Sequence, residues 1–92
     1  MKPQYEPQTL ETAIAYLVEE CGKVLAAAGK SLRWGVDSVN PELLPDKQER
    51  NIEWLLREME DLNTAMDRVS KFHRQREYER YEAETRARYE RR

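Results

Sequence analysis

The chain has 92 residues, of which 39% are hydrophobic and 37% are charged, and it contains only three Gly. This composition is typical of one small helical domain with a charged surface, and it excludes a disordered chain. The formal net charge of −2 excludes a global electrostatic attraction to nucleic acid or to an anionic membrane. A domain of this size buries a modest core, so we expect oligomerisation to supply part of its stability.

The cysteine content and the apolar runs predict where the protein works. Cys21 is the only cysteine, which rules out an intrachain disulfide and fits a reducing compartment. It falls on an apolar helix face, and we expect a buried small hydrophobe and not a nucleophile. The N-terminus lacks the apolar core of a signal peptide, and no stretch is long and apolar enough to span a membrane. We therefore expect a cytoplasmic protein without a membrane partner.

The first helix is predicted from residue 10 onward. Thr9 is a plausible N-cap, and Glu11 is favourably placed in the first turn. Apolar residues then recur at alternating intervals of four and three, which is typical of a helix that packs along a seam: Leu10, Ile14, Leu17, Cys21, Val24 and Ala28. Gly29 can end this helix, or a further turn can run through Trp34 to Gly35.

The second helix is predicted after a proline-marked connection over residues 35–45. Asp46 offers an N-cap, and Glu49 stands three residues later, as in a capping box. The apolar residues again alternate between intervals of three and four: Ile52, Leu55, Met59, Leu62, Met66 and Val69, broadened by Leu56 and Phe72. We therefore predict an all-α fold in which residues 1–72 form an antiparallel helical hairpin, completed by a partner chain into a four-helix-type bundle.

Residues 73–92 differ from the rest of the chain. The apolar periodicity stops after Phe72, and seven Arg against five Glu give this segment a net charge of +2, which leaves −4 for residues 1–72. We favour a solvated helical extension, supported by the i,i+4 pair of Glu82 and Arg86. A role in subunit contacts is the main rival. Nucleic-acid binding is the weakest interpretation, because the interleaved Glu residues would repel phosphate.

One acidic pair lies at the edge of the second helix's apolar face. Glu58 and Asp61 are three residues apart, and like charges at this spacing destabilise a helix unless a cation lies between them. Arg57 can neutralise Asp61 from four residues back, whereas Glu58 has no basic residue at helical spacing. Two solvated surface acids are the alternative interpretation.

A second acidic pair, Glu19 and Glu20, lies on the first helix. Lys23 stands at i+4 from Glu19 and at i+3 from Glu20, so ordinary surface ion pairs are one explanation. Antiparallel pairing of the two helices could nevertheless bring Glu20, Glu58 and Asp61 together. Three carboxylates with water molecules suit Mg²⁺, and such an ion can neutralise a polyphosphate.

These residues resemble a known family. The all-α nucleoside triphosphate pyrophosphohydrolases of the MazG-like group carry a Glu-Glu-x-x-Glu motif on one helix and a Glu-x-x-Asp motif on a later one. Residues 19–23 (Glu-Glu-Cys-Gly-Lys) are similar to the first motif, with Lys23 in place of its third acid, and residues 58–61 (Glu-Met-Glu-Asp) to the second. Residues 29–35 also look like the Lys/Arg-aromatic-Gly turn of short phage and prophage members. The resemblance covers roughly residues 10–70.

The resemblance implies a dimeric or tetrameric helical bundle that uses Mg²⁺ to hydrolyse a nucleoside triphosphate to the monophosphate and pyrophosphate. It implies that Glu19, Glu20, Glu58 and Asp61 bind the metal, with Glu20 and Glu58 as the catalytic acids. Lys30 and Arg33 would contact phosphates and Trp34 would stack on a base. From the residues alone, a core or interface role for Trp34 and a solvated loop for Lys30 and Arg33 are alternatives. With Lys23 at the first motif, a catalytically inactive helical oligomer that binds nucleotides or proteins is the alternative function.

Overall fold

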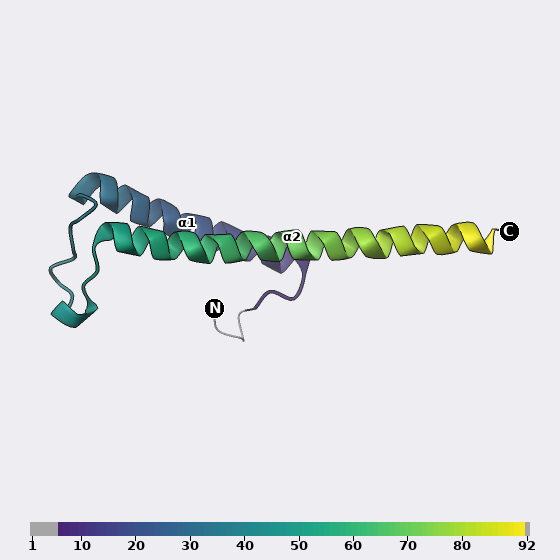
Figure 1. Cartoon of the computed structure of the whole chain (residues 1–92), viewed down its shortest axis with the longest axis horizontal. Helices are drawn as coiled ribbons and strands as arrows, with labels where there is room; N and C mark the ends of the chain where they lie inside the picture. Colours follow the sequence, from purple (N-terminus) through teal and green to yellow (C-terminus); the bar gives the residue numbers. More distant parts are fainter. Residues whose placement is uncertain (1–5, 92) are drawn as a thin grey trace.

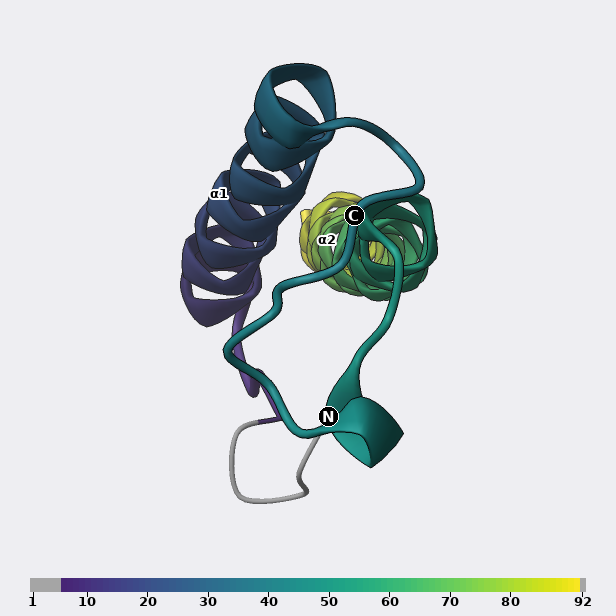
Figure 2. The same ribbon diagram turned by 90° about the vertical axis from the view of Figure 1, so that its left-hand side faces the viewer.

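The computed structural model describes residues 6–91. The first five residues of the predicted segment 1–72 and the last residue of the predicted segment 73–92 lie outside it. Its elements are α1 (Leu10–Trp34), a short 3-10 turn η2 (Pro45–Lys47) and α2 (Asn51–Glu90). The two helices run antiparallel as a hairpin, with the connection at one end (Figures 1 and 2). No β-strand occurs among the described residues, so the predicted all-α class is confirmed.

No helix within residues 6–91 is both long enough and apolar enough to cross a membrane.

Local hydrogen bonds explain the bounds of α1. Thr9 is the N-cap, as predicted: its Oγ1 accepts from the Thr12 backbone N–H at 3.1 Å, and Thr12 Oγ1 accepts from the Thr9 N–H at 3.0 Å. The helix continues past Gly29 to Trp34. Gly35 then ends it with φ of 105°, in the left-handed region that favours glycine. Of the two predicted ends, the later one is therefore correct.

The predicted start of α2 at Asp46 is wrong. Asp46 lies in η2, whereas α2 begins at Asn51 with Arg50 as its N-cap. Glu53 supplies the capping carboxylate, because its Oε1 accepts from the Arg50 backbone N–H at 3.1 Å. The Asn51 side chain donates to the Gly35 carbonyl at 2.9 Å, which ties the start of α2 to the end of α1.

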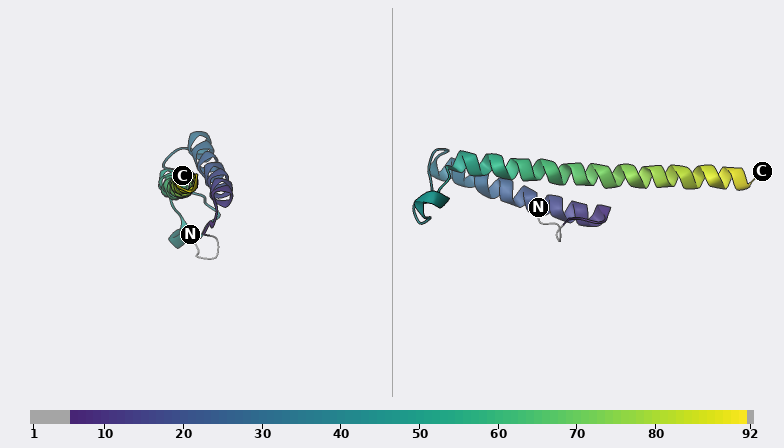
Figure 3. Two further views of the ribbon diagram at one scale, coloured as in Figure 1. Left: turned by 90° about the vertical axis from the view of Figure 1, so that its right-hand side faces the viewer. Right: turned by 60° about the horizontal axis from the view of Figure 1, so that its bottom comes forward.

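The contact between the helices is made by small side chains. The buried hydrophobic residues are Ala13, Ala27 and Ala65, each with 0% exposure, and no large side chain of the described residues is fully buried. Alanine at these positions lets the two helix backbones approach closely. Toward the start of α1, Glu11 forms an ion pair with Arg76, and α2 continues beyond this point without a helix beside it (Figure 3).

A strip of large apolar side chains stays uncovered on one side of the hairpin. We call it the apolar strip; its exposed fractions range from 44% to 88%, and its members are Ile14, Val18, Leu25 and Leu32 on α1 with Leu56, Met59 and Met66 on α2. With about 3.6 residues per turn, the members on each helix form one stripe, and the antiparallel pairing turns both stripes to the same side. Cys21 lies beside this strip and is exposed, so the prediction that it is buried is wrong for the single chain.

The conformation of Gly35 provides a test of the turn. A Cβ at this position would lie 3.2 Å from Ser38 Oγ and would force a side chain into the left-handed region. We expect Gly35→Ala to lower the free energy of unfolding by about 1–2 kcal/mol in urea titrations followed by circular dichroism.

Gly29→Ala is the matched control, because nothing lies within 4 Å of a Cβ there and the residue is inside α1. It should raise the free energy of unfolding by about 0.5–1 kcal/mol through helix propensity. Equal effects of the two substitutions would contradict the assigned role of Gly35.

Candidate metal centre

The hairpin brings three acidic side chains together near its middle. Glu20 comes from α1, and Glu58 and Asp61 come from successive turns of α2. One carboxylate oxygen of each lies within 4.8 Å of an oxygen of both others. The predicted meeting of these residues is therefore confirmed. We call Glu20, Glu58 and Asp61 the carboxylate cluster.

Two members of the cluster are buried in the helix contact. Glu20 is 4% exposed and Glu58 is 7% exposed, and the Oε2 atom of each has no hydrogen-bond partner among the described residues. A buried carboxylate oxygen without a partner is unfavourable, and like charges close together add to the penalty. A hard divalent cation such as Mg²⁺ would relieve both problems, because it prefers oxygen ligands. The residues present therefore fit such an ion.

The other oxygens of these two glutamates are occupied. Glu20 Oε1 accepts from the Lys23 ammonium at 3.3 Å. Glu58 Oε1 accepts from the Trp54 indole N–H at 3.1 Å and from Arg57 at 3.4 Å. These bonds fix one oxygen of each carboxylate and leave the second one free.

Arg57 forms its ion pairs with Glu49 and Glu58 and not with Asp61, whose charge acts on Arg57 only at longer range. Arg57 bonds Glu49 at 2.6 Å, and this hydrogen bond raises the pKa of the Arg57 guanidinium. None of the ion pairs among residues 6–91 involves Asp61, which is more exposed than the two glutamates. Its carboxylate is therefore available at the open edge of the cluster.

Glu19 lies outside the cluster. Its side chain is 66% exposed, and its Oε1 lies 3.9 Å from Lys23 Nζ. The predicted ion pairs of Lys23 with both glutamates are thus present. The hydrogen bond to Glu20 raises the pKa of Lys23, with smaller contributions from the charges of Glu19 and Glu58.

Two aromatic residues that the sequence did not single out adjoin the cluster. Tyr16 stands one turn before Glu20, and its pKa is raised by burial and further by the negative charges of Glu20 and Asp61. Trp54 stands one turn before Glu58, and its indole N–H donates a hydrogen bond to the Glu58 carboxylate. In both cases the i−4 spacing from a cluster acid was the available signal.

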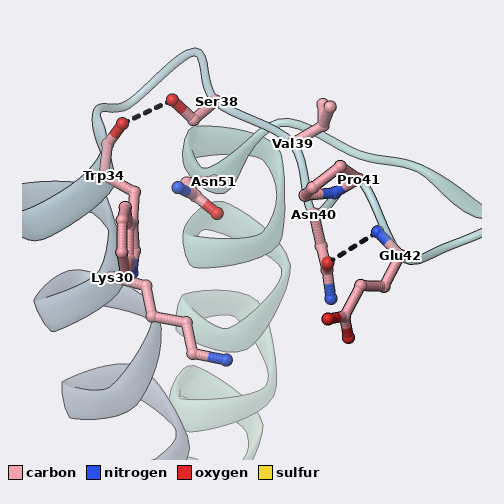
Figure 4. A pocket seen from close by; sticks show the side chains of 8 residues that line it. All are labelled: Lys30, Trp34, Ser38, Val39, Asn40, Pro41, Glu42 and Asn51. Atoms are coloured by element: carbon pink, nitrogen blue, oxygen red, sulfur yellow. Dashed lines mark hydrogen bonds between the residues drawn. The ribbon is translucent and has the colours of Figure 1, made fainter.

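A pocket of about 500 Å³ lies where the end of α1, the connection and the start of α2 meet (Figure 4). Lys30, Trp34, Asn40, Glu42 and Asn51 are among the residues that line it. Of the predicted substrate-binding residues, Lys30 and Trp34 share this pocket, whereas Arg33 does not line it. Trp34 is 66% exposed, so a core role for it is wrong in the single chain.

Lys30 and Trp54 link this pocket to the carboxylate cluster. Lys30 Nζ lies 5.0 Å from the centroid of the Trp54 ring, a cation–π contact, and the same indole donates its N–H to Glu58. Lys30, which lines the pocket, and Glu58, which belongs to the cluster, therefore share Trp54 as a neighbour.

Comparisons of the chain with protein-family models, with curated proteins and with solved structures found no match. Function is therefore inferred from the geometry of the site.

Glu58→Gln tests whether the buried charge of Glu58 destabilises the protein when no metal is bound. The amide keeps an acceptor for Trp54 and removes a buried charge, so in a chelator we expect it to stabilise the protein by about 1 kcal/mol, a few degrees in Tm. Mg²⁺ should raise the Tm of the natural protein and should have little effect on the variant. Thermal unfolding followed by circular dichroism measures both.

Glu60→Gln is the control, because Glu60 has an exposed side chain two residues away on α2. It should change neither the Tm in chelator nor the response to Mg²⁺. A natural protein whose Tm is indifferent to Mg²⁺ would contradict a metal-binding cluster.

Proposed function

We propose that this protein is a MazG-like, Mg²⁺-dependent nucleoside triphosphate pyrophosphohydrolase that acts in the cytoplasm, where its single cysteine stays reduced. The observation that carries the proposal is the pair of unpartnered, buried oxygens on Glu20 of α1 and Glu58 of α2, in a cluster with the Asp61 carboxylate. Such an arrangement is unfavourable unless a cation is bound, and cations held by carboxylates commonly serve phosphate chemistry.

The surrounding side chains have distinct tasks in this reaction. When bound, Mg²⁺ supplies positive charge for the phosphates and lowers the pKa of a coordinated water. Glu20, Glu58 and Asp61 would hold the ion. Glu20 Oε1, which Lys23 contacts at 3.3 Å, would accept the proton of the attacking water. The attack breaks the bond between the α-phosphorus and the bridging oxygen, and pyrophosphate leaves. Lys30 provides a cation for the phosphates, and Trp34 offers an exposed ring for the base.

We further propose a homodimer or homotetramer in which a second copy covers the apolar strip. Among residues 6–91, the hydrophobic side chains with 0% exposure are Ala13, Ala27 and Ala65, which is a small core for the chain's length. Seven large apolar side chains on one side of the hairpin are unusual for a monomer. A matching hairpin from a second copy would complete a four-helix-type bundle.

A catalytically inactive helical oligomer that binds nucleotides or proteins is the second candidate. The observation that favours it is the contact of Lys23 with Glu20 at 3.3 Å, which places a positive charge beside the cluster. This charge opposes the binding of a divalent cation, and a site weakened in this way could hold a ligand without turning it over.

Leu25→Glu tests the proposed assembly. Leu25 is 72% exposed in the apolar strip, and a charge there would be buried in the interface. We expect the natural protein to sediment as a dimer or tetramer and the variant to sediment at least one step smaller. Ala26→Glu, one residue later and outside the strip, should assemble like the natural protein. A monomeric natural protein would contradict the assembly.

The proposed activity is tested by incubation with Mg²⁺ and a panel of nucleoside triphosphates, with release of pyrophosphate as the readout. Glu58→Gln should lower kcat/KM by at least about 100-fold, because it removes a metal ligand. Glu60→Gln should retain the activity of the natural protein. If the natural protein releases no pyrophosphate and Lys23→Glu restores none, the enzymatic proposal is wrong.

A further inference from the structure

Lys23 lies at the rim of the carboxylate cluster, and both of its ion pairs are with carboxylates of α1. Its Nζ lies 3.3 Å from Glu20 Oε1 and 3.9 Å from Glu19 Oε1, and its own side chain is half exposed. Glu19 and Glu20 are adjacent in sequence, so the ammonium is held between two carboxylates of one helix turn. The Lys23 ammonium is therefore a cation that the carboxylates of Glu19 and Glu20 already hold.

The carboxylate oxygens of the cluster that Lys23 does not contact can form one further cation site. Glu20 Oε2 and Glu58 Oε2 have no hydrogen-bond partner, and Asp61 takes part in none of the ion pairs of residues 6–91. The other oxygen of each glutamate is already taken by Lys23 or by Trp54 and Arg57. Three carboxylates each retain acceptor capacity, which suits one hydrated divalent ion.

The charges agree with this count. The three cluster carboxylates carry −3, and Lys23, which also contacts Glu19, offsets at most one of these charges, so at least two negative charges remain for a divalent ion. Arg57 adds little to this balance, because its guanidinium is also bonded to Glu49 at 2.6 Å. A second divalent ion would find fewer ligands, because the other oxygen of each buried glutamate is already hydrogen-bonded.

We propose that Lys23 is the resident cation of this site, so that each chain binds a single divalent ion through Glu20, Glu58 and Asp61. Glu19 then holds Lys23 in place and does not bind the metal. The proposal rests on the metal-binding cluster of the proposed function, but it concerns the number and position of the cations and not turnover.

The stoichiometry of Mn²⁺ binding tests this assignment. Mn²⁺ shares the preference of Mg²⁺ for oxygen ligands, and its free form is counted directly by electron paramagnetic resonance. We expect one Mn²⁺ per chain in the natural protein. Lys23→Glu replaces the resident cation by a carboxylate beside Glu19 and Glu20, so we expect it to bind two.

Two further variants make the test specific. Lys23→Met removes the charge without adding a ligand, so one Mn²⁺ should still bind, about tenfold more tightly, because the repulsion is gone. Lys71→Glu makes the same charge change on an exposed residue of α2, ten residues past Asp61, and should bind one Mn²⁺ with the affinity of the natural protein. Circular dichroism confirms that each variant is folded; if Lys23→Glu is not, the affinity of Lys23→Met decides.

The result is independent of catalysis. One Mn²⁺ per chain, tighter binding by Lys23→Met and no pyrophosphate release would support the assignment of Lys23 and refute the proposed activity. Two ions, or none, in the natural protein would overturn the assignment, even if pyrophosphate is released. An unchanged affinity of Lys23→Met, or the same gain in Lys71→Glu, would also overturn it.

Discussion

The burial of two carboxylates in the contact between α1 and α2 is the constraint on which the rest of this structure depends. The helices approach closely because Ala13, Ala27 and Ala65 line the contact, and this approach excludes water from Glu20 and Glu58. Two buried like charges oppose the pairing of the helices unless cations compensate them. Lys23 and the bonds to Glu58 supply part of this compensation. On the proposed function, a divalent ion would compensate the remaining negative charge.

The two sides of the hairpin are suited to different tasks. Helical periodicity places the apolar strip on one side, and it places Lys23 and Asp61 on the other side of the contact. A second copy seated on the apolar strip would therefore leave the open edge of the carboxylate cluster accessible. Assembly and ligand binding need not compete for the same surface. The same assembly would bury Cys21, which lies beside the strip and is exposed in the single chain.

The features that follow from residue spacing along a helix could be predicted from the sequence. The features that depend on which of several partners a side chain bonds could not. The apolar periodicity predicted both helices, and their antiparallel pairing predicted that Glu20 would meet Glu58. The start of α2 was misplaced because Asp46 and Glu53 both satisfy capping rules. The later start is selected by bonds to the connection, which local patterns do not predict: the Asn51 side chain bonds Gly35, and the Asn51 and Ile52 N–H groups bond Ser38 and Val36. Arg57 was assigned to Asp61 by spacing, but a long side chain can reach Glu49, eight residues away. No pattern rule covers such a choice.

The contact of Trp54 with both Lys30 and Glu58 determines how the pocket and the cluster can act together. Among residues 6–91, Lys30 is the one cation that lines the pocket, and Glu42 adds a negative charge to it. A polyphosphate bound beside Lys30 would thus meet too little positive charge from the protein alone. On the proposed function, the rest would come from an ion at the carboxylate cluster, where Glu58 accepts the Trp54 N–H. The Trp54 N–H donates to Glu58, and the face of the same ring contacts the Lys30 ammonium. Displacement of this ring would therefore disturb both Glu58 in the cluster and Lys30 in the pocket.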